Sequence, residues 1–551
     1  MATTRGIERT LRLLTRTANP AAIEVLDAGL RSDEPVMREA AARALSRRRG
    51  SASVHTLLLA LAETPPDVQR AVSTPDAALR LRPGVLSAIK GDDLHLCKRA
   101  ARYAHDAGDA YVLPTLAEQS SRPDHPYGLG LATTALHLAK LLSERIYTPD
   151  QVAPDGPVQD PAFPRRAALN ALIRAVDLFG KHGHLELVEA FLLLVVPDDL
   201  VLRRVLTDPT HAAHQPMLES LANSTAPGAM HVVCAALLQE HPPAPLIGVL
   251  TSRTDRAFVE YLLTDLGEQP PLRALESARG LAGFAWGEPQ HQPTLMQLTG
   301  PQQATALKLL AATSMSKRRL SALCEAMLES GKVEGRVSAC HVIGGLNSRV
   351  ASSLISRALT DPENAVVAAA TTQLRNRGID GSTEKLISLL DHQHESVQKA
   401  AQGAAQSSLP EHNYRAFCER FDLLEEPARQ VQGRLVGKAD PKCAAAVRRD
   451  LSTASPKQRL RTLEVAGALG IGDQLSEALL EHISDDDPAI RAAAARALGG
   501  AKNEAARKAL TAALKDKNST VREAADQALG PLPPIDLASG LVSDMQQEFP
   551  L

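Results

Sequence analysis

Histidines that stand close to another metal-ligating residue are the first candidates for chemistry in this chain. Two pairs occur, at spacings i, i+2 and i, i+3, and one further histidine precedes a glutamate: His182 and His184, His211 and His214, and His394 with Glu395. A bound ion gathers three or more protein ligands, and neither pair has a cysteine or carboxylate at ligand spacing. The sequence therefore predicts loop or surface histidines and no metal.

The sequence motifs of common catalytic sites are missing. There is no GxxxxGK[ST] loop, no GxSxG elbow, no HEXXH pair and no GxGxxG after a strand. We therefore expect no catalytic residue, no cofactor and no enzyme activity.

A recurring arginine is the remaining candidate. It follows a position that returns every 31 residues, namely Gly335, Val366, Val397, Ala428, Arg459, Ile490 and Val521. An arginine follows that position at Arg336, Arg429, Arg491 and Arg522, and Arg38 is equivalent near the N-terminus, while Val367, Gln398 and Leu460 break the series. Such arginines either meet acidic groups of a partner or hold carboxylates and helix-end carbonyls of a neighbouring repeat, and we favour the internal role.

Helices must position these arginines. In the copy DPAIRAAAARALGG, Asp487 can cap a helix, Pro488 fits its first turn, and the helix should end at Gly499-Gly500. A second helix is predicted from about Asn503 to Lys515. Each period is thus a helix, a turn, a helix and a turn, and its alanines let neighbouring helices approach closely.

The pattern D-P-x-[IV]-R-x-A-A-x-x-A-L-G resembles the HEAT and HEAT-like families, particularly the short alanine-rich repeats of phycobilisome lyases. It is carried by the segments 487–499, 518–530 and 34–45. The resemblance implies an all-α fold, an α-α superhelix of stacked antiparallel helix pairs with a period of about 31 residues.

The chain is predicted to contain five segments: N-terminal repeats at 1–146, a proline-rich loop or hinge at 147–166, degenerate helical repeats at 167–300, regular repeats at 301–530 and a tail at 531–551. From about Ile89 to Gly300 the helices persist but the 31-residue register is lost. We expect a specific function to lie in that stretch.

Composition limits the possible partners and location. The 61 Lys plus Arg against 63 Asp plus Glu provide no field for attracting nucleic acid, which is not an expected partner. The longest compact apolar run, Ala190–Val196, is too short to cross a bilayer, and the N-terminus has no secretory signal. Six scattered cysteines without CxxC indicate reduced thiols, so we expect a cytoplasmic protein.

Two enzyme families that are similar in fold suggest functional roles for particular residues of this chain. Deoxyhypusine hydroxylases bind two irons through repeated His-Glu pairs, but this chain has one such pair, at the expected start of a helix. Some HEAT-like DNA glycosylases bring aromatic residues to a lesion. The single tryptophan, Trp286, stands in a glycine-rich loop, and we interpret it as a core or loop anchor.

The preferred interpretation is a non-catalytic scaffold that binds another protein along a solenoid surface. In the families that the chain resembles, the second helix of each pair lines the concave side, so the candidate partner-binding residues are Arg336, Gln398, Arg429, Arg491 and Arg522. The alternatives are an enzyme or enzyme partner similar to the bilin lyases and, third, a nucleic-acid-binding protein. The partner and the oligomeric state stay open.

Overall fold

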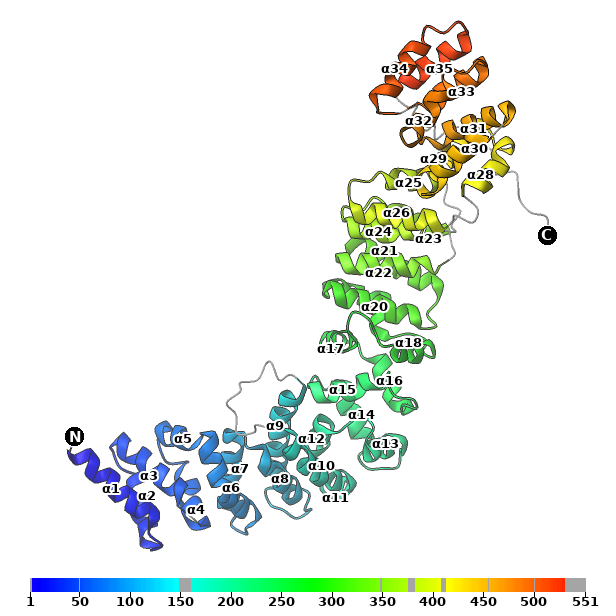
Figure 1. Ribbon diagram of the computed structural model, residues 1–551. Coiled ribbons are helices and arrows are strands. Elements are labelled where there is room, and N and C mark those ends of the chain that lie inside the picture. The colour runs from blue at the N-terminus through cyan, green and yellow to red at the C-terminus, as the bar shows by residue number, and fades with distance from the viewer. Residues whose placement is uncertain are drawn as a thin grey trace. The chain divides into compact units, whose positions relative to one another are not determined.

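The computed structural model describes residues 2–48, 50–147, 160–346, 349–374, 382–407, 413–453, 455–499 and 501–530. Every regular element in these ranges is a helix, which confirms the all-α class (Figure 1). The chain divides into two compact units, one of Met1–Leu295 with Ala312–Ser314 and one of Met296–Ala311 with Met315–Leu551. None of the described helices is long and apolar enough to cross a membrane.

Unit 1 is a stack of helices in which most contacts join a helix to the next one or to the second one along the chain. Its α-helices, of which α19 reaches the boundary, are α1 (Ala2–Arg16), α2 (Ala21–Leu30), α3 (Pro35–Arg47), α4 (Ser51–Ala60), α5 (Pro66–Val72), α6 (Pro75–Lys90), α7 (Leu94–Ala107), α8 (Leu113–Ser120), α9 (Gly128–Tyr147), α10 (Ala162–Asp177), α11 (Phe179–His182), α12 (Leu185–Leu194), α13 (Leu200–Thr207), α14 (His214–Asn223), α15 (Pro227–Ala235), α16 (Ala244–Ser252), α17 (Arg256–Leu266), α18 (Leu272–Arg279) and α19 (Gln292–Gln297). In the described part of the unit, 3-10 turns lie between some of them: η1 (Ala110–Val112), η3 (Ala285–Gly287) and η4 (Pro289–His291).

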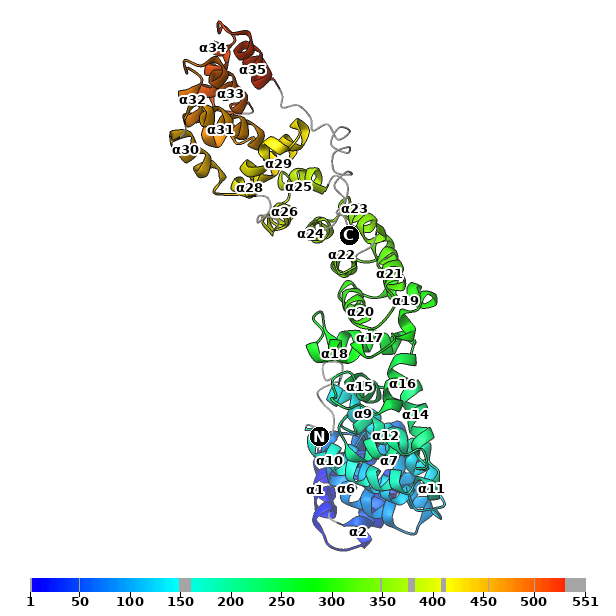
Figure 2. The same ribbon diagram turned by 90° about the vertical axis from the view of Figure 1, so that its right-hand side faces the viewer.

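Unit 2 contains the regular repeats. Its helices are α20 (Gly300–Ala312), α21 (Lys317–Ser330), α22 (Val333–Gly344), α23 (Arg349–Ala358), α24 (Asn364–Thr372), α25 (Ser382–Leu390), α26 (Glu395–Ser407), α28 (Tyr414–Arg420), the 3-10 turn η5 (Phe421–Leu423), α29 (Glu426–Ala439), α30 (Cys443–Thr453), α31 (Pro456–Leu469), α32 (Gly472–His482), α33 (Pro488–Ala497), α34 (Glu504–Ala513) and α35 (Ser519–Leu529). The arginine-bearing helices α29, α31, α33 and α35 each contact the next, and α30, α32 and α34 form the second layer (Figures 1 and 2). This layered stacking is the expected α-α superhelix.

The C-terminal helices begin where their capping residues predict. Asp487 accepts the backbone N–H of Ala489, and Pro488 is the first residue of α33. Asn503 caps α34 through the N–H of Ala506, at 2.7 Å. An oxygen acceptor at the N-cap satisfies one of the otherwise unpaired first N–H groups of a helix. Local sequence alone therefore sets both helix starts.

Close packing explains the alanines of α33. Ile490, Ala494 and Ala497 are buried as the helical spacing predicts. Ala492, Ala493 and Ala495 are buried as well, because α33 packs against α31 on one side and α35 on the other. A central helix of a stack thus has a wider apolar face than its 3.6-residue periodicity suggests.

The irregular stretch contains the longest helix described, the 20-residue α9. The apolar stretches 169–178, 185–196 and 258–266 of the sequence fall largely in α10, α12 and α17. Trp286 is 1% exposed and stacks on Phe284, with ring centroids 5.2 Å apart. Its assignment as a buried anchor is confirmed.

The predicted loop at 147–166 is wrong at its C-terminal end, because residues 162–166 are the first turn of α10. The N–H of Ala162 donates to Asp160, and Arg165 reaches the end of α12 by donating from Nε to the carbonyl of Leu194, at 2.8 Å. Residues 148–159 and the predicted tail 531–551 lie outside the described residues. The hinge therefore stays a prediction.

Candidate functional site

The recurring arginine joins consecutive repeats of unit 2. Arg491 donates from Nε and Nη2 to the two carboxylate oxygens of Asp516, at 2.9 and 3.0 Å. Its Nη1 donates to the carbonyls of Asp485 and Asp486, at 2.8 and 3.1 Å. The ion pair lowers the pKa of Asp516 and raises the pKa of Arg491, in both cases chiefly through their side-chain hydrogen bonds. This guanidinium is engaged on all three nitrogens by its own protein.

The same contact occurs in two other repeats. Arg336 donates from Nη2 to Asp361, at 3.1 Å, and its Nη1 donates to the carbonyl of Gly331. Arg459 donates from Nη1 to Asp485, at 3.4 Å. The side chains of Arg336 and Asp361 are only 17% and 10% exposed, so this pair is largely removed from solvent. These arginines hold the next repeat, as the favoured internal role predicts.

The remaining members differ in exposure. Arg522 donates to the carbonyls of Asp516 and Lys517 but is exposed. Gln398 is also exposed and donates to the carbonyl of His392, at 2.6 Å. Arg429 is half-buried; its Nε donates to the carbonyl of Phe421, and its guanidinium lies over that ring, 4.8 Å from the centroid. The five candidates therefore divide into enclosed and exposed groups, and they do not converge on one site.

The interruption predicted at Leu460 is wrong. Arg38, Arg336, Arg429, Arg491 and Arg522 are each the fourth residue of their helix. In α31, the fourth residue is Arg459, so the register is displaced by one residue relative to the 31-residue period. Asp485 accordingly lies 26 residues after its arginine, whereas Asp361 and Asp516 lie 25 residues after theirs.

The acidic partners of these arginines are not among the residues predicted from the sequence, although the sequence contains a signal for them. Each of Asp361, Asp485 and Asp516 opens the turn before a helix and accepts the N–H of the second residue after it, at 2.8–2.9 Å. Two of them, Asp485 and Asp516, are 31 residues apart, the period of the array. An aspartate in such a turn is already explained by its hydrogen bond to the nearby backbone N–H. Its presence in the sequence therefore does not indicate the second contact, with an arginine of the preceding repeat.

The candidate histidines have structural roles. The ring of His182 contacts the carbonyl of Ala175, at 2.8 Å, and that of His214 contacts the carbonyl of Val205, at 2.8 Å. His394 contacts Ser396 beside the start of α26, and Glu395 pairs with Lys399 one turn along that helix. No group of three or more metal-ligating side chains occurs in the described part of the chain.

All six cysteines are free, and five of them are buried. Burial raises the pKa of every one of these thiols, to about 12 for Cys324, Cys340 and Cys443. A thiol with a raised pKa is a poor nucleophile and a poor metal ligand. The cysteines therefore act as small core residues.

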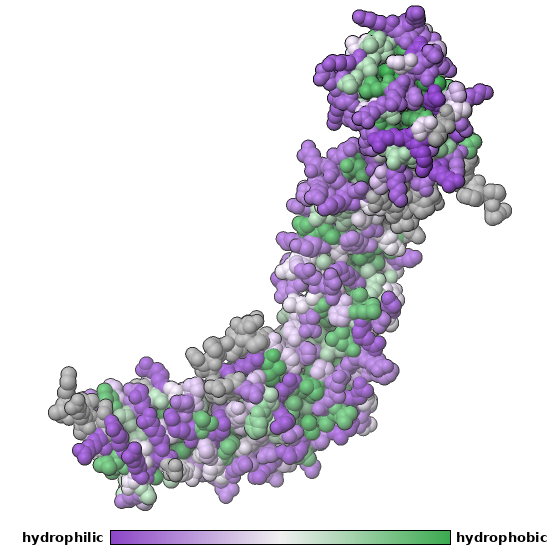
Figure 3. Space-filling model, viewed as in Figure 1, coloured by the Kyte–Doolittle hydropathy of each residue, from purple (hydrophilic) through white to green (hydrophobic). Residues whose placement is uncertain are grey.

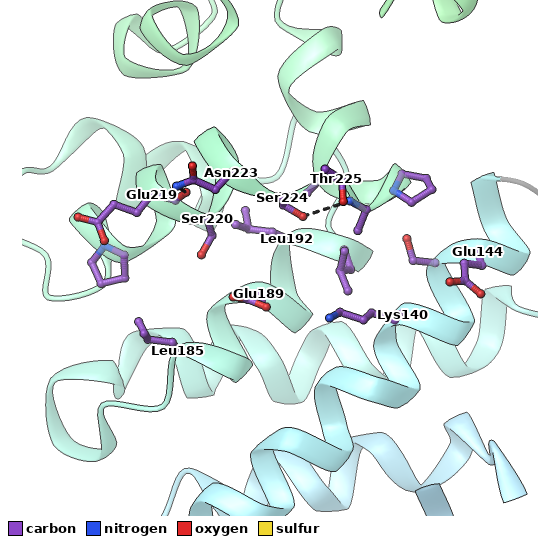
Figure 4. A pocket seen from close by; sticks show the side chains of 16 residues that line it. Lys140, Glu144, Leu185, Glu189, Leu192, Glu219, Ser220, Asn223, Ser224 and Thr225 are labelled. Atoms are coloured by element: carbon purple, nitrogen blue, oxygen red, sulfur yellow. Dashed lines mark hydrogen bonds between the residues drawn. The ribbon is translucent and has the colours of Figure 1, made fainter. Parts of the chain in front are cut away.

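A cavity of about 630 Å³ lies inside unit 1, within the stretch where the repeat register is lost. Its walls come from α9, α12, α14 and the turn into α15 (Figure 4). The helices meet closely at one side because the second residue of α15 is a glycine: a Cβ on Gly228 would lie 2.1 Å from the carbonyl oxygen of Leu193 and 2.6 Å from Oγ of Ser143. The sequence does not predict this cavity, since its walls come from four separate helices.

The cavity combines apolar and acidic groups. Leu192, Leu193 and Ala229 are 1–2% exposed and form apolar wall, while Leu185 is 51% exposed at the rim. Hydrophobic side chains are exposed over the part of unit 1 that contains α12, α13 and α14 (Figure 3). The charged lining residues are three glutamates and one lysine, namely Glu144, Glu189, Glu219 and Lys140. The arrangement offers apolar contacts and negative charge to a bound molecule.

Comparison with known proteins identifies HEAT repeats in the C-terminal part of the chain. Residues 445–533 match the family model of HEAT repeats, a range that contains most of α30 and all of α31 to α35. No curated protein has a significant sequence match to the chain. The phycobilisome-lyase type of repeat is not distinguished by these findings.

Solved structures show only a distant likeness. One, from work on a phosphorylation switch that controls the interaction between cadherin and beta-catenin, is 14% identical with a TM-score of 0.35, over 92% of this chain and 98% of the other. A structure of the Pds5–Scc1 complex is 12% identical with a TM-score of 0.29, over 84% and 71%. Such TM-scores are too low for the partners of either protein to be carried over.

Proposed function

We propose that the chain is a non-catalytic scaffold that binds another protein along the surface of its stacked helices. The observation that carries this proposal is the continuous layer of α29, α31, α33 and α35, in which each helix contacts the next. Stacked repeats bury their core between neighbours and leave an extended face for a partner. The ion pairs between repeats, such as Arg491 with Asp516, support a rigid array suited to that role.

Exposure decides which arginine-series residues we propose as partner contacts. Gln398 and Arg522 present exposed side chains and keep that assignment. Arg336 and Arg491 would first have to leave their aspartates, and Arg429 its carbonyl, so a structural role accounts better for them. Separating a partly buried ion pair leaves a charge unpaired, which is costly.

We further propose a cytoplasmic location, supported by six free cysteines in a chain without a disulfide. No specific observation favours the bilin-lyase-like or nucleic-acid-binding alternatives, and neither is proposed.

Affinity capture with the full chain tests the scaffold function. Immobilised wild-type protein should retain a specific polypeptide from lysate, and the purified polypeptide should bind with a Kd below roughly 10 μM by calorimetry. Arg522→Glu should weaken this binding. Arg507→Glu, an exposed arginine on α34 with no side-chain partner among the described residues, should not. If no polypeptide is retained above a bead control, the scaffold proposal fails; equal retention by both variants removes Arg522 from the contact surface.

A further inference from the structure

We propose that the cavity between α9, α12, α14 and α15 binds a short peptide segment that presents an aliphatic side chain next to a lysine or arginine. This inference deepens the protein-binding function above and rests on it. The volume of about 630 Å³ falls within the usual range of ligand pockets and accommodates a few side chains.

The apolar part of the wall defines the aliphatic position. Leu192 and Leu193 lie on α12, and Ala229 lies opposite on α15. Leu185 begins the same helix as Leu192 and is half exposed at the rim, where a ligand would cover it. Covering apolar surface of this kind is the main favourable contribution to binding.

The charged part of the wall defines the basic position. The lining contains three glutamates and one lysine, so it carries an excess of negative charge at neutral pH. Glu189 is half-buried on α12 and has no ion pair or side-chain hydrogen bond in the described part of the chain. Among the described residues, the carboxylate of Glu219 accepts a hydrogen bond only from its helical neighbour Gln215, at 2.7 Å. A cation entering this lining would gain attraction that the protein itself does not supply.

A buried hydroxyl is the independent sign of an unfilled site. Ser143 on α9 is 1% exposed, lines the cavity, and its Oγ has no hydrogen-bond partner among the described residues. Buried hydroxyls are nearly always paired, because leaving one unpaired costs about 1–3 kcal/mol. A peptide N–H or carbonyl that reaches this wall would pair with it.

The polar rim suits a peptide backbone. Ser220 and Asn223 lie on the last turns of α14, and Ser224 and Thr225 form the turn into α15 (Figure 4). Thr225 is exposed, and no hydrogen bond of its side chain is present in the described region. Hydroxyl and amide groups beside an apolar wall are the lining that fixes the orientation of a bound chain.

Panning tests the proposal while the natural partner is still unidentified. The probe is a phage library of random hexapeptides, selected on the immobilised full chain. The selected peptides should carry lysine or arginine next to leucine, isoleucine, valine or methionine. A fluorescein-labelled copy of the strongest should bind in solution, measured by fluorescence anisotropy.

Three variants locate the site. The double variant Glu189→Gln/Glu219→Gln should bind that peptide roughly 3- to 10-fold more weakly, and Ser220→Trp, which fills the cavity, should abolish binding. Glu186→Gln removes a charge from the same helix outside the cavity and should leave binding unchanged. Circular dichroism checks folding, and the isosteric double variant decides the question if Ser220→Trp does not fold.

Selection of acidic peptides, or binding that all three variants leave unchanged, would overturn the proposal. If panning selects nothing while affinity capture yields a partner, the cavity proposal fails and the scaffold function stands. If neither experiment yields a ligand, both fail.

Discussion

Arg491 and Asp516 are 25 residues apart and face each other through two parallel hydrogen bonds across the junction of two repeats. The geometry uses the planar fork of the guanidinium, which matches a carboxylate in a way that the ammonium group of lysine does not. Their side chains are 17% and 15% exposed. The contact is therefore protected enough to contribute to stability.

Removing this arginine should loosen the C-terminal repeats. We expect Arg491→Ala to lower the stability of α33 and α35 by about 1–3 kcal/mol, the range for partly buried hydrogen bonds to charged groups. Hydrogen exchange measured by mass spectrometry, peptide by peptide, reports this local change in the full chain. Arg507→Ala on α34 is the matched control and should change protection by less than about 0.5 kcal/mol. Equal effects of the two variants would assign no stabilising role to the ion pair.

A second prediction concerns the small residues at which neighbouring helices pack together. Ala494 is fully buried in α33, whereas Ala489 on the same helix is exposed. Because the packing against α31 and α35 has no room for a ring, Ala494→Phe should destabilise unit 2 by about 1–3 kcal/mol. Ala489→Phe should leave the melting temperature nearly unchanged. Unaltered melting of Ala494→Phe would show that α33 is placed in the wrong register.

Two helical glycines should respond to alanine in opposite directions. A Cβ on Gly228 would lie 2.1 Å from a backbone oxygen of α12, while a Cβ on Gly248 in α16 meets nothing within 4 Å. Gly248→Ala should therefore stabilise the protein by roughly 0.5–1 kcal/mol through helix propensity, and Gly228→Ala should destabilise it by more than that amount. Thermal melts of the two single variants measure both signs. A stabilising Gly228→Ala would contradict the close approach of α15 to α12.

The histidine turn before α12 predicts a dependence of stability on pH. The N–H of His184 donates to Nδ1 of His182, at 3.0 Å, so Nε2 must carry the proton that faces the carbonyl of Ala175. Burial lowers the pKa of His182 below 6.5. The unfolded chain then binds the extra proton first, so the stability due to this histidine is complete above about pH 6.5 and is lost as the pH falls toward the folded-state pKa.

Melting curves at pH 7.5 and pH 5.5 should show a lower melting temperature at pH 5.5. The variant His182→Gln removes this titration and should lose less on acidification. Burial is the main cause of a lowered pKa at five other histidines, namely His125, His137, His231, His341 and His482, so part of the decrease should persist. An equal decrease in variant and wild type would remove His182 from the explanation.

Sequence predicts the elements whose causes are local. The caps Asp487 and Asn503 set the starts of their helices, and spacing alone places Ala494 on the buried face. What escapes prediction depends on residues distant in the chain. The 31-residue period aligns Arg459 with Ile490, an apolar position. In the structure α31 is displaced by one residue from that period, so Arg459 is instead equivalent to Arg491. The cavity needs Ser143 and Gly228 together, and no period relates them.

The turns before α33 and α35 each bind two arginines, one through an aspartate carboxylate and one through a backbone carbonyl. Asp485 accepts Arg459 on its carboxylate and Arg491 on its carbonyl, and Asp516 accepts Arg491 and Arg522 in the same way. From Arg459 to Arg522 the contacts thus form an unbroken series: the ion pairs link Arg459 and Arg491 to the turn ahead, and the carbonyl contacts link Arg491 and Arg522 to the turn behind. Among the described residues, Arg522 forms no ion pair with a later aspartate, so the series ends there. Because one turn accepts two arginines, disrupting that turn should weaken the contacts with the helices on both sides of it, so neighbouring repeats should lose stability together.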